Sequence, residues 1–408
     1  MLADGRINRY SDRGGEILRG WKGRFGVLLV FLGVVYLPLL GSFLATGNFP
    51  AGYGAFPARF VQAPPGFSLA YFVGFSLFAL VILLFLLFPR LFGFRRSVRL
   101  PRPAGGKFPW WFWVSIPVVV VFWFLMWARA PWLYHAEHYA FVPLAWGMIG
   151  LLDGLVFRRN GGRSLMATKA TTFKVMILIS CLSWFLFEYL NFFVLENWYY
   201  PNATIFSDFG LIVWFCLGYT TVLTGIFEWY CLLRTFGRFS SRYRQGPKVT
   251  PPRPVLVVVV FVGLALALGM GLFPYPLFWA IWVSLVPTLG AALILAGKKT
   301  FLDDLRQGDW TKTCVIAVAT LCNGIFWELW NFGSQWFHPT IPTTPGFWRY
   351  SVPYVDVVHV FSEMPLLGYW GYFFFGLNCW VLWNLASYFF GFDDGVDDLF
   401  PAPEGPQP

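Results

Sequence analysis

The chain contains repeated apolar stretches that are long enough to cross a lipid bilayer, and these constrain its fold more than any other feature. No residue between Phe25 and Thr46 is charged, for example. A helix needs about 20 mostly apolar residues to span the hydrocarbon, and in lipid its backbone groups must bond within the segment. With 57% hydrophobic and 12% charged residues, the chain is predicted to be an all-α, polytopic helical membrane protein.

Hydropathy along the chain predicts about ten transmembrane helices. Their approximate boundaries are residues 25–47, 67–89, 110–128, 139–157, 173–195, 209–233, 255–273, 277–296, 313–333 and 366–390.

The basic residues predict the orientation of these helices. Of the 30 Lys and Arg residues, 27 lie in the first segment or in alternate loops, and the exceptions are Arg59, Arg129 and Arg349. Because positively charged loops remain in the cytoplasm, we expect both termini to be cytoplasmic and the protein to lie in the plasma (inner) membrane. The net charge of +10 is then explained by orientation and by contact with anionic membrane lipids, without nucleic acid as a partner.

Two apolar segments carry the same polar pair. They read SWFLFEYLNF (residues 183–192) and NGIFWELWNF (residues 323–332), so that Glu188 and Asn191 recur 140 residues later as Glu328 and Asn331. The offset predicts two parallel four-helix repeats preceded by two N-terminal helices. The predicted organisation has five parts: a basic cytoplasmic tail (1–24), two N-terminal helices with a basic loop (25–107), the first repeat (108–250), the second repeat with a long outer loop at 334–365 (251–392), and an acidic cytoplasmic tail that we expect to be solvated (393–408).

Carboxylates within apolar spans are energetically expensive, and their presence favours a functional site. We therefore predict that Glu188 and Glu328 are catalytic and face the protein interior. Each pair is followed by an aromatic segment, NWYYPN (residues 197–202) and QWFHPT (residues 335–340). These segments fit an interfacial aromatic belt. The alternative is a role in binding for Trp198, Trp336 and His338, together with Asn191 and Asn331.

The long outer loop contains the segment YVDVVHVFSEMP (residues 354–365), with Asp356, His359 and Glu363 at positions i, i+3 and i+7. A helix would place all three on one face, whereas a strand would turn Asp356 away from the others. We predict that the three are catalytic, by acid–base chemistry or with a divalent metal held by His338, His359 and Glu363. The alternative is that they only tie the loop through hydrogen bonds.

Two further acids, Asp153 and Glu228, lie near cytoplasmic ends of spans, where we expect ion pairs with Arg158 or Arg234. The histidines His135 and His138 fit either a solvated pair or additional metal ligands.

Three functions fit these patterns. The first is an integral membrane enzyme acting on a lipid or isoprenoid-like substrate at an outer-leaflet site, where aromatic rings select apolar chains or stabilise cations. The second is an integral subunit or membrane anchor of a larger complex, with membrane-complex subunits as partners. The third is a transporter with parallel repeats. The chain has no H-E-x-x-H, P-loop or G-x-S-x-G motif.

Overall fold

The computed structural model describes residues 7–57, 63–95, 105–128, 131–194, 197–336 and 344–400. In these ranges the regular structure is helical apart from two strands of two residues each, and loops and turns connect the helices. Nine helical stretches in the described ranges are long and apolar enough to span a membrane. These are Trp21–Thr46, Leu69–Leu87, Trp110–Trp127, Phe141–Arg159, Ala170–Val194, Asp208–Arg234, Arg253–Leu272, Thr311–Trp336 and Leu366–Phe390. The predicted class, an all-α polytopic membrane protein, is confirmed.

The principal elements used below are bounded as follows: α1 Ile7–Thr46, α2 Leu69–Leu87, α3 Trp110–Trp127, α4 Tyr134–Glu137, α5 Phe141–Arg159, α6 Leu165–Thr168, α7 Ala170–Asn191, β1 Trp198–Tyr199, α8 Asp208–Tyr219, α9 Thr221–Arg234, α10 Gly237–Ser241, α11 Arg253–Leu272, α12 Ala280–Val283, α13 Leu285–Leu295, α14 Thr311–Trp336, β2 Arg349–Tyr350, η6 Leu366–Trp370 and α15 Gly371–Phe390.

The eighth predicted span, residues 277–296, differs from the prediction. It forms the short helices α12 and α13, of 4 and 11 residues, in place of one long helix. At 1.5 Å per residue, α13 covers about 16 Å, roughly half of the hydrocarbon thickness. Apolar composition alone does not reveal such a break.

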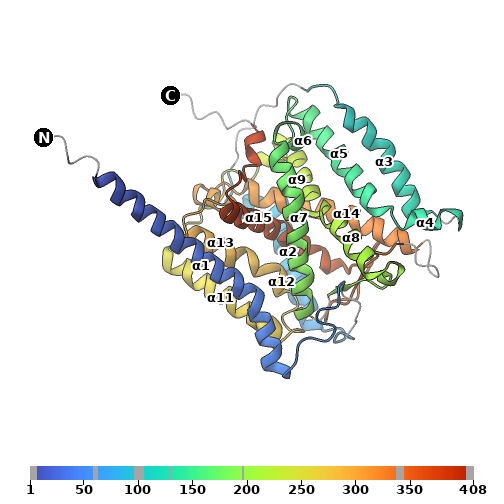
Figure 1. The fold of residues 1–408 in the computed structure, drawn as a ribbon, viewed down its shortest axis with the longest axis horizontal. Helices are drawn as coiled ribbons and strands as arrows, with labels where there is room; N and C mark the ends of the chain where they lie inside the picture. Colours follow the sequence, from blue (N-terminus) through green and yellow to red (C-terminus); the bar gives the residue numbers. More distant parts are fainter. Residues whose placement is uncertain are drawn as a thin grey trace.

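Helices from the two halves of the chain pack in matching pairs. α3 packs on α5 and α11 on α13, while α9 contacts α14 and α15 contacts α7. In Figure 1, α3 and α5 form one flank, α1 and α11 form the other, and α7 and α14 lie between them. The organisation into two parallel repeats stays a prediction.

The contact between α1 and α11 depends on small residues. A Cβ atom at Gly41 would lie 2.2 Å from the carbonyl oxygen of Leu268, and one at Gly271 would lie 2.0 Å from that of Pro38. The two backbones therefore touch, as is common where helices associate in lipid.

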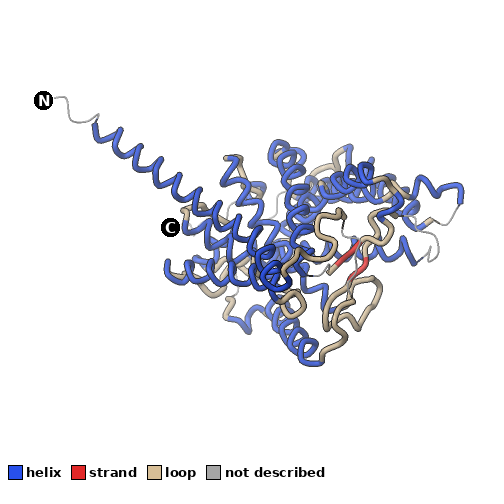
Figure 2. Tube along the Cα trace, turned by 60° about the horizontal axis from the view of Figure 1, so that its bottom comes forward, coloured by secondary structure: helices blue, strands red, loops and turns tan. Residues whose placement is uncertain are grey.

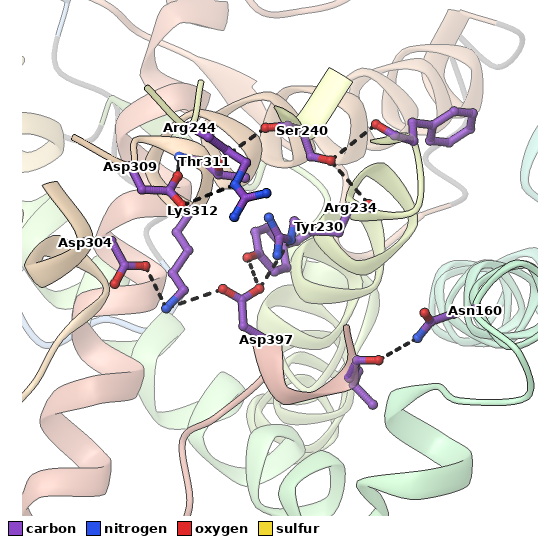
Figure 3. A network of polar contacts seen from close by, with 12 residues as sticks. Asn160, Tyr230, Arg234, Ser240, Arg244, Asp304, Asp309, Thr311, Lys312 and Asp397 are labelled. Carbon is purple, nitrogen blue, oxygen red and sulfur yellow. Dashed lines mark hydrogen bonds and ion pairs between the residues drawn. The ribbon is translucent and has the colours of Figure 1, made fainter. Parts of the chain in front are cut away.

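The acidic segment after α15 is docked against the protein. As Figure 3 shows, Asp397 accepts from the Tyr230 hydroxyl and pairs with Arg234 Nε at 3.3 Å and Lys312 Nζ at 3.3 Å. Val396 and Leu399 are buried beside it. The expectation of a solvated tail is therefore wrong for Asp397.

The same segment joins several basic loops on one face of the molecule. Lys169 Nζ lies 2.8 Å from Asp393 and 3.0 Å from Asp398, and Lys298 Nζ lies 3.0 Å from Asp394. We call the face that these contacts define the basic face. It carries Lys169 before α7, Arg234 at the end of α9, Lys298 after α13 and Lys312 at the start of α14. That the basic face is cytoplasmic stays a prediction.

Away from the basic face, the two halves meet in a short antiparallel ladder. β1 pairs with β2 through Trp198 opposite Tyr350 and Tyr199 opposite Arg349. Figure 2 shows the two strands side by side among loops. This ladder fixes the aromatic residues that surround both glutamates.

Candidate functional site

Glu188, on α7, is a buried acceptor for four aromatic side chains. Its Oε1 accepts from the indole N–H of Trp184 at 2.8 Å and of Trp198 at 3.2 Å. It also accepts from the hydroxyls of Tyr200 at 2.6 Å and Tyr219 at 3.1 Å. The prediction that Glu188 faces the interior is consistent with its 3% exposure.

Glu328, on α14, has the same kind of surroundings. Its Oε1 accepts from Tyr350 at 2.5 Å, from Tyr372 at 2.8 Å and from the indole of Trp348 at 3.3 Å. The side chain is fully buried. Each glutamate is therefore held by a tryptophan and a tyrosine from its own strand region, and by a second tyrosine from the following span.

The paired asparagines fix the backbone that carries these aromatic residues. Asn191 Nδ2 donates to the Trp198 carbonyl at 2.8 Å, and Asn331 Nδ2 donates to the Trp348 carbonyl at 2.8 Å. The Trp348 amide also donates to Asn331 Oδ1 at 3.0 Å. The asparagines thus position the tryptophans, and the binding role predicted for them stays a prediction.

One difference separates the two sites. Trp184 precedes Glu188 by four residues, and the corresponding position before Glu328 is Gly324. A Cβ atom at Gly324 would lie 2.6 Å from the ring of Tyr372. The glycine therefore provides the space that Tyr372 needs to reach Glu328.

A cavity of about 750 Å³ lies among these aromatic residues. It is bounded by α2, α7, α8, α12, α14, β1, β2 and the start of α15, and 20 of its 34 lining residues are aromatic. None of the described residues that line it is charged. Its size and apolar lining are typical of sites for small molecules.

The glutamates lie behind this lining. The cavity is lined by Tyr200, Tyr219, Tyr350 and Tyr372 and by Trp184, Trp198 and Trp348, but Glu188 and Glu328 are absent from its walls. The rings face the cavity while their N–H and O–H groups reach the carboxylates. The glutamates therefore do not line this cavity, and the tyrosine hydroxyls are the polar groups that connect them to it.

Burial also fixes the protonation state of the tyrosines outside the spans. Burial, followed by the neighbouring Glu188 carboxyl, raises the pKa of Tyr200 well above its ordinary value. Burial and Glu328 do the same to the pKa of Tyr350. Both phenols therefore keep their protons near neutral pH and act as donors.

The segment 354–365 is neither helix nor strand but a series of turns and bends. It nevertheless joins two of the predicted residues, since His359 Nε2 lies 2.9 Å from Asp356 Oδ1. Glu363 Oε2 lies 3.6 Å from Arg349 Nε, and Glu363 is close enough to Glu328 for an electrostatic interaction. Burial raises the pKa of both Asp356 and Glu363.

These three residues, which we call the rim residues, are not in the wall of the cavity but belong to a segment that borders it. Val355 and Met364, from the same segment, line the cavity, whereas Asp356, His359 and Glu363 do not. Among the residues that the structure describes, no group of three or more His, Cys, Asp or Glu side chains is placed to hold a metal ion.

The structure does not test His338 as a binding residue, and Trp336 is not among the described residues that line the cavity. His338 lies outside the described residues. Trp336 is 65% exposed and stacks on Phe332, with ring centroids 5.3 Å apart. Trp198, by contrast, lines the cavity as predicted for a binding residue.

The ion pairs expected for the other two intramembrane acids are absent from the described structure. Asp153 accepts from Trp111 at 3.0 Å, from Ser164 at 2.9 Å and from the Met166 amide at 3.0 Å. Glu228 lies beside Asp153, and neither of its oxygens meets a donor among the described residues. The prediction that they pair with Arg158 or Arg234 was wrong, because those arginines contact Phe108 and Asp397 instead.

The sequence contains a local signal for the aromatic ligands of the glutamates. Each Glu/Asn pair is followed by a Trp-x-Tyr triplet, Trp198 to Tyr200 and Trp348 to Tyr350. The triplets are separated by 150 residues and the glutamates by 140. The loop before the second triplet is ten residues longer, so the offset that aligns the glutamates does not align the triplets. Tyr219 and Tyr372 carry no such local signal.

No protein-family model, curated protein or solved structure matches the chain.

Proposed function

We propose that the protein is an integral membrane enzyme acting on a lipid or isoprenoid-like substrate bound in the aromatic cavity. The observation that carries this proposal is the orientation of the cavity lining. Apolar ring faces surround a space of about 750 Å³, while the polar edges of the same rings bond to two buried carboxylates. A predominantly apolar chain fits such a space better than a polar solute.

Acid–base chemistry is the reaction type that these residues favour. Tyr350 both lines the cavity and bonds to Glu328 at 2.5 Å, and Tyr200 has the same relation to Glu188 at 2.6 Å. A tyrosine in this position can pass a proton between the carboxyl group behind it and a substrate in front of it. The ring faces, with a carboxylate behind them, would stabilise positive charge on the substrate.

The rim residues Asp356, His359 and Glu363 are proposed to assist at the mouth of the cavity. His359 Nε2 lies 2.9 Å from Asp356 Oδ1, a contact that orients its ring for proton transfer. A divalent metal at this rim, with His338 contributing, stays an alternative for the same residues.

A second candidate function is that of an integral subunit or anchor of a membrane complex. It is favoured by the observation that the carboxylate bonds tie α7 and α14 to the outer segments around β1 and β2. In that case the glutamates and asparagines act as structural ties.

Filling the cavity tests whether it binds a substrate. Gly371 lines the cavity, and a Cβ atom there would lie 3.9 Å from the Trp282 ring, so Gly371→Leu adds bulk without a backbone clash. We expect the purified wild-type protein to retain an apolar lipid-like compound that mass spectrometry detects and that Gly371→Leu loses. The matched control is Gly26→Leu on α1, where nothing lies within 4 Å of the new Cβ atom.

Chemistry is then tested separately from binding. Glu328→Gln and Tyr350→Phe are expected to retain the compound but to leave it unconverted in membranes, and His359→Ala is expected to slow its conversion. Equal retention by wild type and Gly371→Leu would contradict a bound substrate. Loss of a co-purifying protein from Glu328→Gln, with no change in bound lipid, would favour the subunit function instead.

A further inference from the structure

One wall of the large cavity is formed by α2, a span that packs loosely on the protein. Five residues of α2 line the cavity, at spacings that place them on one face of the helix: Ala70, Tyr71, Gly74, Phe75 and Phe78. In the most apolar 18-residue stretch of α2, 6% of the residues are buried, against 22–67% in the other eight spans of the described ranges. Over these residues, the protein-facing side of α2 therefore borders a cavity and not a packed core.

Both ends of α2 are fixed to the rest of the protein. At the first end, the Ser68 amide donates to the Tyr354 carbonyl at 3.1 Å, and the rings of Tyr71 and Tyr354 stack with their centroids 4.2 Å apart. At the other end, the Tyr243 hydroxyl donates to the Leu86 carbonyl at 2.8 Å, and Leu86 is buried. Hydrogen bonds and packing thus hold the two ends in place.

The middle of α2 meets α15 through two aromatic rings. Phe78 stacks on Phe374, with ring centroids 5.8 Å apart and ring planes inclined by 10°. Both rings line the cavity, and the neighbouring α2 residues Leu77 and Val81 are exposed. In the described structure, α2 thus separates the cavity from the surrounding lipid on this side, and the two rings close the seam between α2 and α15.

This seam lies at the depth of the hydrocarbon. Phe78 is the tenth of the 19 residues of α2. It is therefore about 14 Å along the axis from the first residue, close to the middle of a hydrocarbon layer about 30 Å thick. Polar solutes are excluded from that depth, because their hydrogen bonds to water would be lost.

We propose that the ligand of the large cavity enters from the bilayer through the seam between α2 and α15, and that Phe78 and Phe374 are its gate. The inference rests on the proposed function, because it names the source and the route of the same substrate. Acyl chains solvate apolar side chains well, so separating two rings in lipid costs little free energy. The rings can turn aside while both ends of α2 stay in place. The ligand is then a compound dissolved in the membrane, such as a single-chain lipid or an isoprenoid, and not a solute of the aqueous phase.

Labelling of a cysteine placed in the cavity tests this route. Gly371 lines the cavity, and a Cβ atom there would lie 3.9 Å from the Trp282 ring, so Gly371→Cys adds a thiol without a clash. The full chain is reconstituted in nanodiscs and treated with N-(1-pyrenyl)maleimide, which dissolves in the bilayer, or with a sulfonated maleimide, which stays in water. Mass spectrometry of the peptide that carries residue 371 distinguishes this thiol from the native cysteines. We expect the bilayer-soluble reagent to modify residue 371 faster.

Variants of the gate are compared in the same Gly371→Cys protein. Phe78→Ala and Phe374→Ala should each speed modification by the bilayer-soluble reagent about 2- to 13-fold, the rate equivalent of losing one aromatic pair. The double variant should stay within about twofold of either single variant, since each change alone removes the pair. Leu77→Ala is the matched control, because Leu77 adjoins Phe78 but does not line the cavity, and it should leave the rate unchanged.

Modification by the sulfonated reagent at an equal or faster rate would overturn the proposal, because the cavity would then be filled from water. Rates unchanged by both Phe78→Ala and Phe374→Ala would also overturn it, as would failure of both reagents to reach residue 371 in the folded protein. Labelling needs no native substrate, whereas the proposed function fails if no lipid-like compound is retained. The two proposals therefore fail separately.

Discussion

Replacing Glu188 by leucine is expected to leave four buried donors without an acceptor. They are the indole groups of Trp184 and Trp198 and the hydroxyls of Tyr200 and Tyr219. Each buried donor that loses its partner costs about 1–3 kcal/mol, which gives about 4–12 kcal/mol when none finds another acceptor. Because a whole domain is stabilised by only about 5–15 kcal/mol, we expect Glu188→Leu to accumulate poorly or to unfold readily.

Two matched variants separate this effect from the loss of charge. Glu188→Gln retains an oxygen that can accept from the same four donors, and should remain folded. Glu328→Leu removes the acceptor of three donors, but the Trp348 indole also donates to the Tyr350 hydroxyl at 3.0 Å, so only the hydroxyls of Tyr350 and Tyr372 lose their partner. Its destabilisation should therefore be smaller than that of Glu188→Leu by about two bonds, or about 2–6 kcal/mol.

The measurement is the free energy of unfolding in mixed micelles with increasing sodium dodecyl sulfate, supported by the fraction that stays monodisperse after heating. We expect the order wild type and Glu188→Gln above Glu328→Leu above Glu188→Leu. Equal stability of Glu188→Leu and Glu188→Gln would refute the reasoning, since the donors would then be satisfied without the carboxylate.

Cysteines introduced at Gly106 and Gly346, where added side chains meet open space, should react with an impermeant maleimide from opposite sides of the membrane, and reaction of both from one side would contradict the predicted topology. Gly271→Leu should lower the melting temperature in detergent by forcing α1 away from α11, because its Cβ atom would lie 2.0 Å from a backbone oxygen of α1; an unchanged melting temperature would rule out that close contact. The hydrogen bond that Lys169 donates to Asp393 lowers the pKa of Asp393 and raises the pKa of Lys169. Their stabilisation of the docked acidic segment should therefore be present between the ordinary pKa values of about 3.9 and 10.4, and be lost as pH falls below or rises above this window. Hydrogen exchange in that segment, corrected for the intrinsic rate, measures this loss, and a pH-independent rate would count against it.

The outer loop shows where local patterns stop being informative. The spacing of Asp356, His359 and Glu363 fits a helix, but the segment forms turns that still bring Asp356 and His359 to within 2.9 Å. Its conformation is set by packing, since Val355 and Met364 line the cavity and are buried. Similarly, the charges of the acidic segment suggested exposure to solvent. Their partners are basic side chains that lie far away in the chain, such as Lys169 and Arg234.

The sequence by itself determined the class of the protein and the positions of nine spans, and it singled out the two glutamates that are buried among aromatic donors. These are local properties, because the bilayer requires long apolar helices and makes a carboxylate within such a helix energetically expensive. Tertiary structure decided what surrounds those glutamates. Tyr219 lies 31 residues from Glu188 and Tyr372 lies 44 from Glu328, and only helix packing brings their hydroxyls to the carboxylates. It also formed the cavity lined by the aromatic ligands of both glutamates, which a hydropathy pattern cannot encode, because a cavity is formed by elements that are distant in the chain.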